Sequence, residues 1–296
     1  MKPILVHCHI YYPEMWAELR ECIHNIEPHP FELFATMVEE HSSIHQDILT
    51  HFPNAHIEIV ENRGYDIGPF VHIINQVNLD NYSYVVKLHT KRDMNPNKPL
   101  FRNKEGSKWR DALLSFIKTT EIFNQYLRVF DKNPLIGMQA THTVIVHHDF
   151  YDEKAKKGVK QYLKDSHLPT IKYAFVAGTM FIARSSIFKD IQNLYLTPED
   201  FPDPKGKHET QFAHIMERLF GYIVYKNHMV VRDGLLSIKE ETKYHQKQKI
   251  KNICLKPLLK FFWNRKITKS GVLSIKICKI PVYRRKSHAY YKNNKS

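Results

Sequence analysis

The stretch AHIEIVENRGYDIGPFVHIINQV, residues 55–77, decides the fold that the sequence predicts. It opens with a strand-like apolar run, passes through a loop rich in glycine and polar residues, and ends in a helix-like run. Glycine lets the backbone adopt positive φ or approach another group closely. The loop holds more polar side chains than a turn requires. The stretch therefore predicts a strand, a ligand-binding loop and a helix in succession.

The same alternation of strand-like and helix-like stretches runs through the first 235 residues. It is typical of an α/β domain with a mostly parallel sheet covered on both faces, in which ligands bind at the carboxyl ends of strands. The predicted strands are 3–10, 31–37, 55–62, 82–90, 135–140 and 175–184, and the predicted helices are 13–26, 41–51, 70–77, 109–127 and 209–220.

The basic charge of the chain belongs to its C-terminal end. The 296 residues carry a formal net charge of +14, but residues 243–296 hold 16 of the 44 Lys and Arg and no Asp or Glu. Residues 1–242 are therefore slightly acidic, with 28 basic and 30 acidic side chains. We predict a domain at 1–242 and a basic tail at 243–296, and the acidic body disfavours a nucleic-acid-binding protein.

The tail also carries an amphipathic pattern. In LKPLLKFFW, residues 255–263, apolar side chains fall at helical offsets 0, 3, 4, 7 and 8. A helix with a bulky apolar face and flanking cations suits an anionic membrane surface, and the alternative is a helix that packs on the body.

Other features of the chain point to the cytoplasm. No apolar stretch reaches the roughly 20 residues of a spanning helix. The N-terminal apolar run is too short for a signal peptide. The four cysteines form no CxxC pair. We therefore expect a cytoplasmic protein that attaches peripherally to the inner face of the cytoplasmic membrane.

Polar residues gather where the first, third and fourth strands end. The end of the fourth strand combines cations and a hydroxyl that suit a diphosphate, and the alternative is a charged strand exit. Gly178 and Thr179 interrupt an apolar strand, which marks either close approach of a ligand or a bulge. His7 and His9 share one strand face and can bind a metal, contact a ligand or pack in the core. The candidate ligand-binding residues are His9, Tyr11, Asn62, Arg63, Gly64, Asp66, Lys87, His89, Thr90, Lys91, Gly178 and Thr179.

The predicted helix at 209–220 supplies the candidate catalytic residues Glu209, His214 and Glu217. Glu209 is either a charge that stabilises the helix start or the general base that a transfer to a hydroxyl needs. His214 lies about one turn before Glu217, so the two side chains can touch.

Six motifs, taken in chain order, resemble the rhamnan synthesis protein F family of bacterial surface-polysaccharide glycosyltransferases. They are HCHIYYP (7–13), NRGYDIGPF (62–70), VVKLHTK (85–91), WRDALL (109–114), FVAGTMFIAR (175–184) and AHIMERLF (213–220). The resemblance covers about residues 4–235 and implies a nucleotide-diphospho-sugar transferase fold like GT-A. It also implies that Asp66 binds the base or ribose of the donor.

The chain departs from the pattern of this resemblance in three places. Many GT-A enzymes carry a DxD metal motif where this chain has Lys87, His89 and Lys91, so His89 and Lys91 are expected to replace the metal as partners of the diphosphate. We expect no cofactor, and a requirement for Mg²⁺ or Mn²⁺ stays open. Asp93 stands where the family has a serine, and Glu209 replaces an aspartate.

The resemblance predicts a glycosyltransferase that moves a sugar from a nucleoside-diphosphate sugar to a lipid-linked or core oligosaccharide acceptor. The family name suggests dTDP-rhamnose as donor, and the stereochemical outcome stays open. The alternative is a non-catalytic glycan- or nucleotide-binding subunit of a polysaccharide assembly complex. On this prediction Asp66→Ala weakens donor binding and leaves the fold intact, because Asp66 lies in a loop.

Overall fold

The computed structural model describes residues 2–92, 106–148, 153–201 and 212–237, residues 239–240, 242–244 and 246, and the tail stretches 263–267, 272–277 and 280–286. The chain divides into two compact units, residues 1–236 and 237–296. The boundary predicted from charge, between residues 242 and 243, lies slightly later in the chain.

A seven-stranded sheet forms the centre of the first unit, in the order β3-β2-β1-β4-β8-β5-β9. Four strands, β3, β2, β1 and β4, run parallel, β8 is antiparallel to both of its neighbours, and β5 and β9 are parallel to each other. The predicted α/β fold with a mostly parallel sheet is therefore confirmed. The strands are β1 Ile4–Ile10, β2 Phe31–Met37, β3 His56–Ile59, β4 Tyr84–His89, β5 Ile136–Gln139, β8 Phe181–Arg184 and β9 Val230–Arg232.

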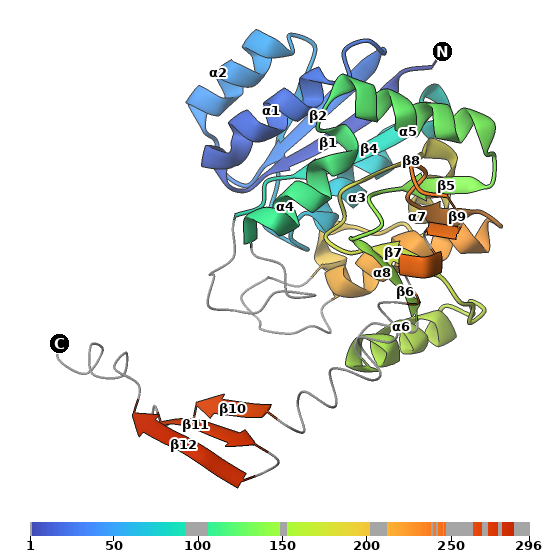
Figure 1. The fold of residues 1–296 in the computed structure, drawn as a ribbon. Helices are drawn as coiled ribbons and strands as arrows, with labels where there is room; N and C mark the ends of the chain where they lie inside the picture. Colours follow the sequence, from blue (N-terminus) through green and yellow to red (C-terminus); the bar gives the residue numbers. More distant parts are fainter. Residues whose placement is uncertain are drawn as a thin grey trace. The chain divides into compact units, whose positions relative to one another are not determined.

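Helices cover both faces of this sheet (Figure 1). One face carries α1 Trp16–His24, α2 Ser42–His51 and α5 Thr120–Lys132, and the other carries α3 Ile67–Gln76, α7 Lys189–Gln192 and α8 Phe212–Lys226. The remaining helices are α4 Gly106–Leu114 and α6 Glu153–Asp165, and β6 Ile145–His147 pairs with β7 Ala174–Val176. Against the second face, Phe70 of α3 packs edge-on with Phe181, Phe188 and Phe220 at centroid distances of 5.2–6.1 Å.

Two predicted elements are divided in the structure. The strand expected at 175–184 is broken by a turn at Gly178 and Thr179, both of which have positive φ, into β7 and β8. The helix expected at 109–127 becomes α4 and α5, because Thr119 caps a new helix by accepting a hydrogen bond from the Ile122 amide at 3.2 Å. Hydrophobic periodicity registers neither break, since apolar residues continue on both sides.

The tail contains a three-stranded antiparallel sheet of β10 Trp263–Ile267, β11 Val272–Ile277 and β12 Ile280–Lys286. Residues 255–262 of the expected amphipathic helix lie outside the described residues, and its last residue, Trp263, begins β10 instead. Within the described part of the chain, no helix is long and apolar enough to cross a membrane.

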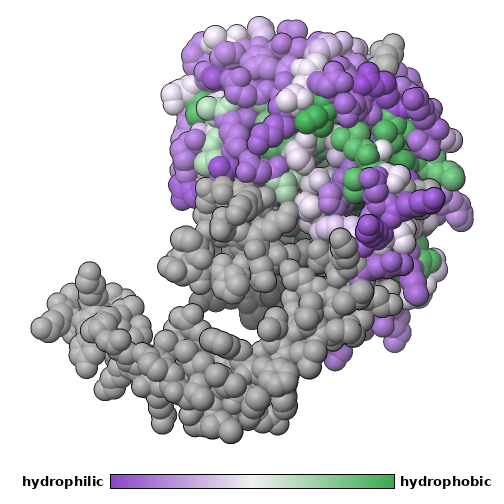
Figure 2. Space-filling model, viewed as in Figure 1, coloured by the Kyte–Doolittle hydropathy of each residue, from purple (hydrophilic) through white to green (hydrophobic). Residues whose placement is uncertain are grey.

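The surface of the first unit seen in Figure 2 is mostly hydrophilic over α1 and α2, and hydrophobic residues appear there only in small groups.

Candidate functional site

A cleft of about 330 Å³ lies at the carboxyl ends of β1, β2, β3 and β4. This is the edge at which α/β sheets bind ligands, and the volume falls in the range of small-molecule pockets. The structure thus brings together the three loops that the sequence singled out, and adds the loop after β2. The lining residues are Ile10, Tyr11, Tyr12, Pro13, Val38, Glu39, His41, Asn62 and Arg92.

Thr90 fixes one wall of this cleft. Its hydroxyl accepts hydrogen bonds from the backbone amides of Tyr11 and Tyr12, each at 2.9 Å, and its own amide donates to the His9 carbonyl at 3.0 Å. Thr90 is buried. It therefore joins the loops after β1 and β4.

Arg92 and Tyr12 are cleft residues that the sequence analysis missed. The Arg92 guanidinium lies over the Tyr12 ring, 4.3 Å from its centroid, and forms an ion pair with Glu14. Its side chain is 59% exposed, so it remains accessible to a ligand. The motif HTKR, residues 89–92, could have indicated Arg92, since a cation two residues beyond Thr90 is well placed to reach over the end of the strand.

Beneath the cleft, one face of the sheet carries a buried polar layer. His7 pairs with Lys87 and His9 with His89 across β1 and β4, so all four side chains lie on the face that α3 covers. Thr36 of β2 joins them, because its Oγ1 lies 3.0 Å from His7 Nε2 and 3.0 Å from His9 Nδ1. His7 Nδ1 and His9 Nε2 have no hydrogen-bond partner.

Asp66 neutralises the centre of this layer. The chain reaches it through Gly64 (φ 72°) and Tyr65 (φ 57°), and the left-handed backbone at Gly64 is one that glycine adopts without strain. Asp66 Oδ2 lies 2.5 Å from Lys87 Nζ and accepts a hydrogen bond from Thr179 Oγ1. This contact explains the glycine in the loop, which turns the backbone so that the carboxylate meets the lysine.

Burial and charge act in opposite directions on these groups. Burial alone would raise the pKa of Asp66, but His89, Lys87 and the hydrogen bonds from Lys87 and Thr179 hold it well below its usual range. Burial lowers the pKa of His9 to about 3 and that of His89 to about 4, and it lowers the pKa of His7 as well. The histidines are therefore neutral at pH 7, and the Asp66–Lys87 pair carries the charge of the layer.

The turn between β7 and β8 connects this layer to α8. Gly178 has φ 84°, its carbonyl lies 2.8 Å from His89 Nε2, and its amide donates to Glu217 Oε1 at 2.8 Å. Glu217 Oε2 lies 2.7 Å from Arg218 Nη1. Both oxygens of Glu217 thus have partners, and the glycine inside the apolar run is a turn held from two sides.

The predicted site residues therefore fall into separate groups. Tyr11 and Asn62 line the cleft, whereas Lys87, His89, Thr90 and Thr179 are buried below or beside it. Arg63 forms an ion pair with Glu61 at 2.6 Å and lines a groove along α3. The ring of His214 stacks on the ring of Tyr65 at a centroid distance of 5.8 Å. Lys91 is half-buried, and Glu209 lies outside the described residues.

A second polar group, also missed in the sequence, lies at the carboxyl ends of β5 and β9. Asp233 Oδ2 accepts from the His142 amide at 2.8 Å and lies 3.0 Å from His142 Nδ1, and Asp233 Oδ1 accepts from the Tyr126 hydroxyl at 3.0 Å. These residues are far apart in the chain, so only the fold brings them together.

No group of three or more His, Cys, Asp or Glu side chains in the described ranges, which omit Asp93, could hold a metal ion.

Comparison with known proteins places the chain in a family. The model of the family described as "Rhamnan synthesis protein F" matches residues 1–229. The uncharacterized protein WxcX of two strains of Xanthomonas campestris pv. campestris is 27% identical over 172 residues, which is 57% of this chain and 24% of WxcX. The chain thus matches about a quarter of the length of these curated relatives.

A solved structure gives a weaker likeness. Residues 1–349 of S. aureus TarS align with a TM-score of 0.36 and 10% identity, over 73% of this chain and 55% of that one.

Proposed function

The chain belongs to the rhamnan synthesis protein F family, and on that premise we propose that it is a glycosyltransferase of cell-surface polysaccharide synthesis, with a GT-A-like arrangement. The observation that carries the proposal is the cleft formed by the loops after β1, β2, β3 and β4. Four parallel strands that end in one polar cleft are suited to a nucleotide.

The donor in this proposal is a nucleoside-diphosphate sugar, with dTDP-rhamnose suggested by the family name. Tyr11 and Tyr12 offer aromatic surface to the base, and Arg92 offers a planar guanidinium to the diphosphate. Lys87 is fully buried and paired with Asp66, so its role in the proposal is to hold the loop of Asp66 in place. Arg92 and the half-buried Lys91 then take the phosphate-binding role.

The acceptor in this proposal is a sugar on a lipid carrier or on the core of a lipopolysaccharide, at the inner face of the cytoplasmic membrane. An inverting transfer needs a base for the acceptor hydroxyl. Glu209, Glu217 and His214 remain the predicted candidates. The engagement of both Glu217 oxygens favours Glu209 among the carboxylates.

The alternative is a subunit that binds a nucleotide or glycan without catalysis. A thermal-shift screen of nucleotide sugars, followed by an assay for nucleoside-diphosphate release with polysaccharide acceptors, separates the two. A ligand that binds only the folded chain raises its unfolding midpoint. Stabilisation together with release supports the transferase, and stabilisation without release supports the subunit. No stabilisation by any nucleotide sugar contradicts the transferase and the nucleotide-binding subunit.

Arg92→Gln is expected to weaken binding of UDP or dTDP by about 10–100-fold, because it removes a charge-assisted contact to phosphate. Isothermal titration of the purified chain measures the change. Arg128→Gln is the matched control, since Arg128 is also an exposed arginine beside a glutamate (58% exposed, 3.7 Å from Glu121) but lies on α5, away from the cleft. Equal affinities for the two variants would remove Arg92 from the phosphate site.

The basic tail is proposed to hold the enzyme at an anionic membrane. The full chain should co-sediment with vesicles that contain phosphatidylglycerol and dissociate as salt is raised, because basic residues near an anionic surface attract it only within a Debye length. A chain that ends at Leu236, the last residue of the first unit, should stay folded and fail to co-sediment. If the full chain ignores these vesicles at low salt, or if the shortened chain unfolds, the membrane role is wrong.

A further inference from the structure

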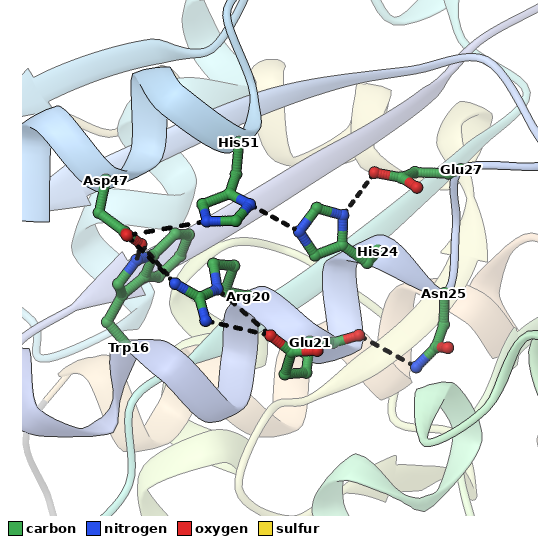
Figure 3. Close-up of polar contacts among 8 residues, drawn as sticks. All are labelled: Trp16, Arg20, Glu21, His24, Asn25, Glu27, Asp47 and His51. Atoms are coloured by element: carbon green, nitrogen blue, oxygen red, sulfur yellow. Dashed lines mark hydrogen bonds and ion pairs between the residues drawn. The ribbon is translucent and has the colours of Figure 1, made fainter.

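Two histidines face each other between the helices that cover the first face of the sheet. His24 is the last residue of α1 and His51 is the last residue of α2. His24 Nε2 lies 3.2 Å from His51 Nδ1, as Figure 3 shows. The side chains are 28% and 35% exposed, so small ions can reach them from solvent.

The outer nitrogen of each ring is directed at a carboxylate (Figure 3). His24 Nδ1 is in close contact with Glu27 Oε1, and His51 Nε2 lies 3.8 Å from Asp47 Oδ1. In metal sites, a histidine ligand usually donates its second ring N–H to a carboxylate, which fixes the tautomer and orients the ring. His24 has this hydrogen bond, whereas His51 Nε2 lies near its carboxylate without a hydrogen bond, and the inner nitrogens of the two rings lie next to each other.

Asp47 is fixed as a carboxylate on its other side. Trp16 Nε1 donates to Asp47 Oδ2 at 2.7 Å, and Arg20 Nη1 lies 3.0 and 3.1 Å from the two oxygens. Trp16 and Arg20 thus hold the Asp47 carboxylate in place beside His51. This carboxylate lies beside His51 Nε2 and can face an N–H there when His51 Nδ1 binds a metal.

The surroundings favour a cation between the rings. Both histidines lie at helix C-terminal ends, where the helix dipole stabilises positive charge. Among the residues in Figure 3, Glu21, Glu27 and Asp47 outnumber the single guanidinium of Arg20. Zinc–nitrogen bonds of about 2.0–2.1 Å in a tetrahedral site place two ligand nitrogens roughly 3.3 Å apart, close to the separation between the rings.

We propose that His24 and His51 form a binding site for a divalent transition-metal cation of the zinc class, which links the ends of α1 and α2. Imidazole is a preferred ligand of such cations, whereas Mg²⁺ and Ca²⁺ take oxygen. His24 Nε2 and His51 Nδ1 are the two protein ligands, and water completes the coordination. The site is independent of the proposed function.

Metal binding at this site requires no net loss of protons. Without metal, His24 Nδ1–H donates to Glu27 and His51 Nδ1–H donates to His24 Nε2. With metal, the His51 proton moves to Nε2 and donates towards Asp47. The same two ring protons remain, and the metal binds the two nitrogens that the hydrogen bond joins in its absence.

The test adds zinc chloride to the chelator-treated full chain and follows the thermal unfolding midpoint. We expect zinc to raise the midpoint of the wild type, because it binds the folded pair of helices. His24→Gln and His51→Gln should each abolish the rise, and Glu27→Gln should weaken zinc binding by about 10–100-fold. His45→Gln is the control, since His45 lies on the same helix as His51 and also has a carboxylate beside it, Glu40 at 3.0 Å.

A second measurement does not depend on the variants. In ¹⁵N NMR spectra of the histidine rings, zinc should shift His24 Nε2 and His51 Nδ1 before other ring nitrogens. Any of three results would overturn the proposal and leave a hydrogen-bonded histidine pair only. Zinc does not raise the midpoint of the wild type, the rise survives in both His24→Gln and His51→Gln, or the ring signals of this pair do not move.

Discussion

Asp66→Ala is expected to lower the free energy of unfolding by about 3–5 kcal/mol, because it leaves a buried lysine without its counter-charge. Lys87 is fully buried, and its ammonium contacts Asp66 Oδ2 at 2.5 Å and Thr179 Oγ1 at 3.0 Å. This differs from the result expected from the sequence, in which Asp66 is a loop residue whose loss spares the fold. Urea unfolding of the wild type and the variant at pH 7.5 measures the difference.

The double variant Asp66→Ala, Lys87→Met separates the lost charge from the lost packing. It should recover part of the stability, because methionine fills the lysine site without charge. A loss below about 1 kcal/mol in the single variant, or a double variant as unstable as the single one, would show that the pair is not the charge centre of the fold.

The free energy of unfolding is also expected to fall steeply as the pH drops from about 6.5 to 4. His7, His9 and His89 have lowered pKa values in the folded chain, near 3 for His9 and near 4 for His89. Below their unfolded pKa of about 6.5, the unfolded chain binds protons that the folded chain excludes, so stability decreases. Each histidine contributes at most about 1.4 kcal/mol per pH unit in this window, and Asp66 begins to contribute only below its unfolded pKa near 3.8.

Urea titrations at pH 7.5, 6.5, 5.5 and 4.5 measure this slope. His9→Asn should reduce it by up to one proton, because it removes one of the three buried histidines. A wild-type slope of less than one proton between pH 6.5 and 4.5 would contradict the assignment of three neutral, buried histidines.

The sequence predicted the sheet because its signal is local. Residues 55–77 carry the strand, loop and helix that the structure contains as β3, the Gly64 turn and α3. The positions of the loops at one edge followed from the parallel arrangement, and Tyr11 and Asn62 do line the cleft. These inferences needed only periodicity and the rule for strand ends.

The chemistry of the individual residues was less accessible. Lys87 and Lys91 are both cations near the end of one strand, yet the first is buried against Asp66 and the second is half-buried. Strand register decides that difference, and spacing alone does not reveal it. Likewise, His24 and His51 are brought together by two helices, and no local pattern in the chain joins them.

The most direct test of the central claim is a crystal structure of the chain with the nucleotide that stabilises it most in the thermal-shift screen. We expect electron density for the nucleotide in the cleft at the ends of β1, β2, β3 and β4, with the diphosphate near Arg92 and the base against Tyr11 or Tyr12. Two results would contradict this expectation. One is density in the groove of about 210 Å³ along α3 and residues 198–199. The other is no bound nucleotide at millimolar concentration, which is about the weakest affinity that would still count as binding.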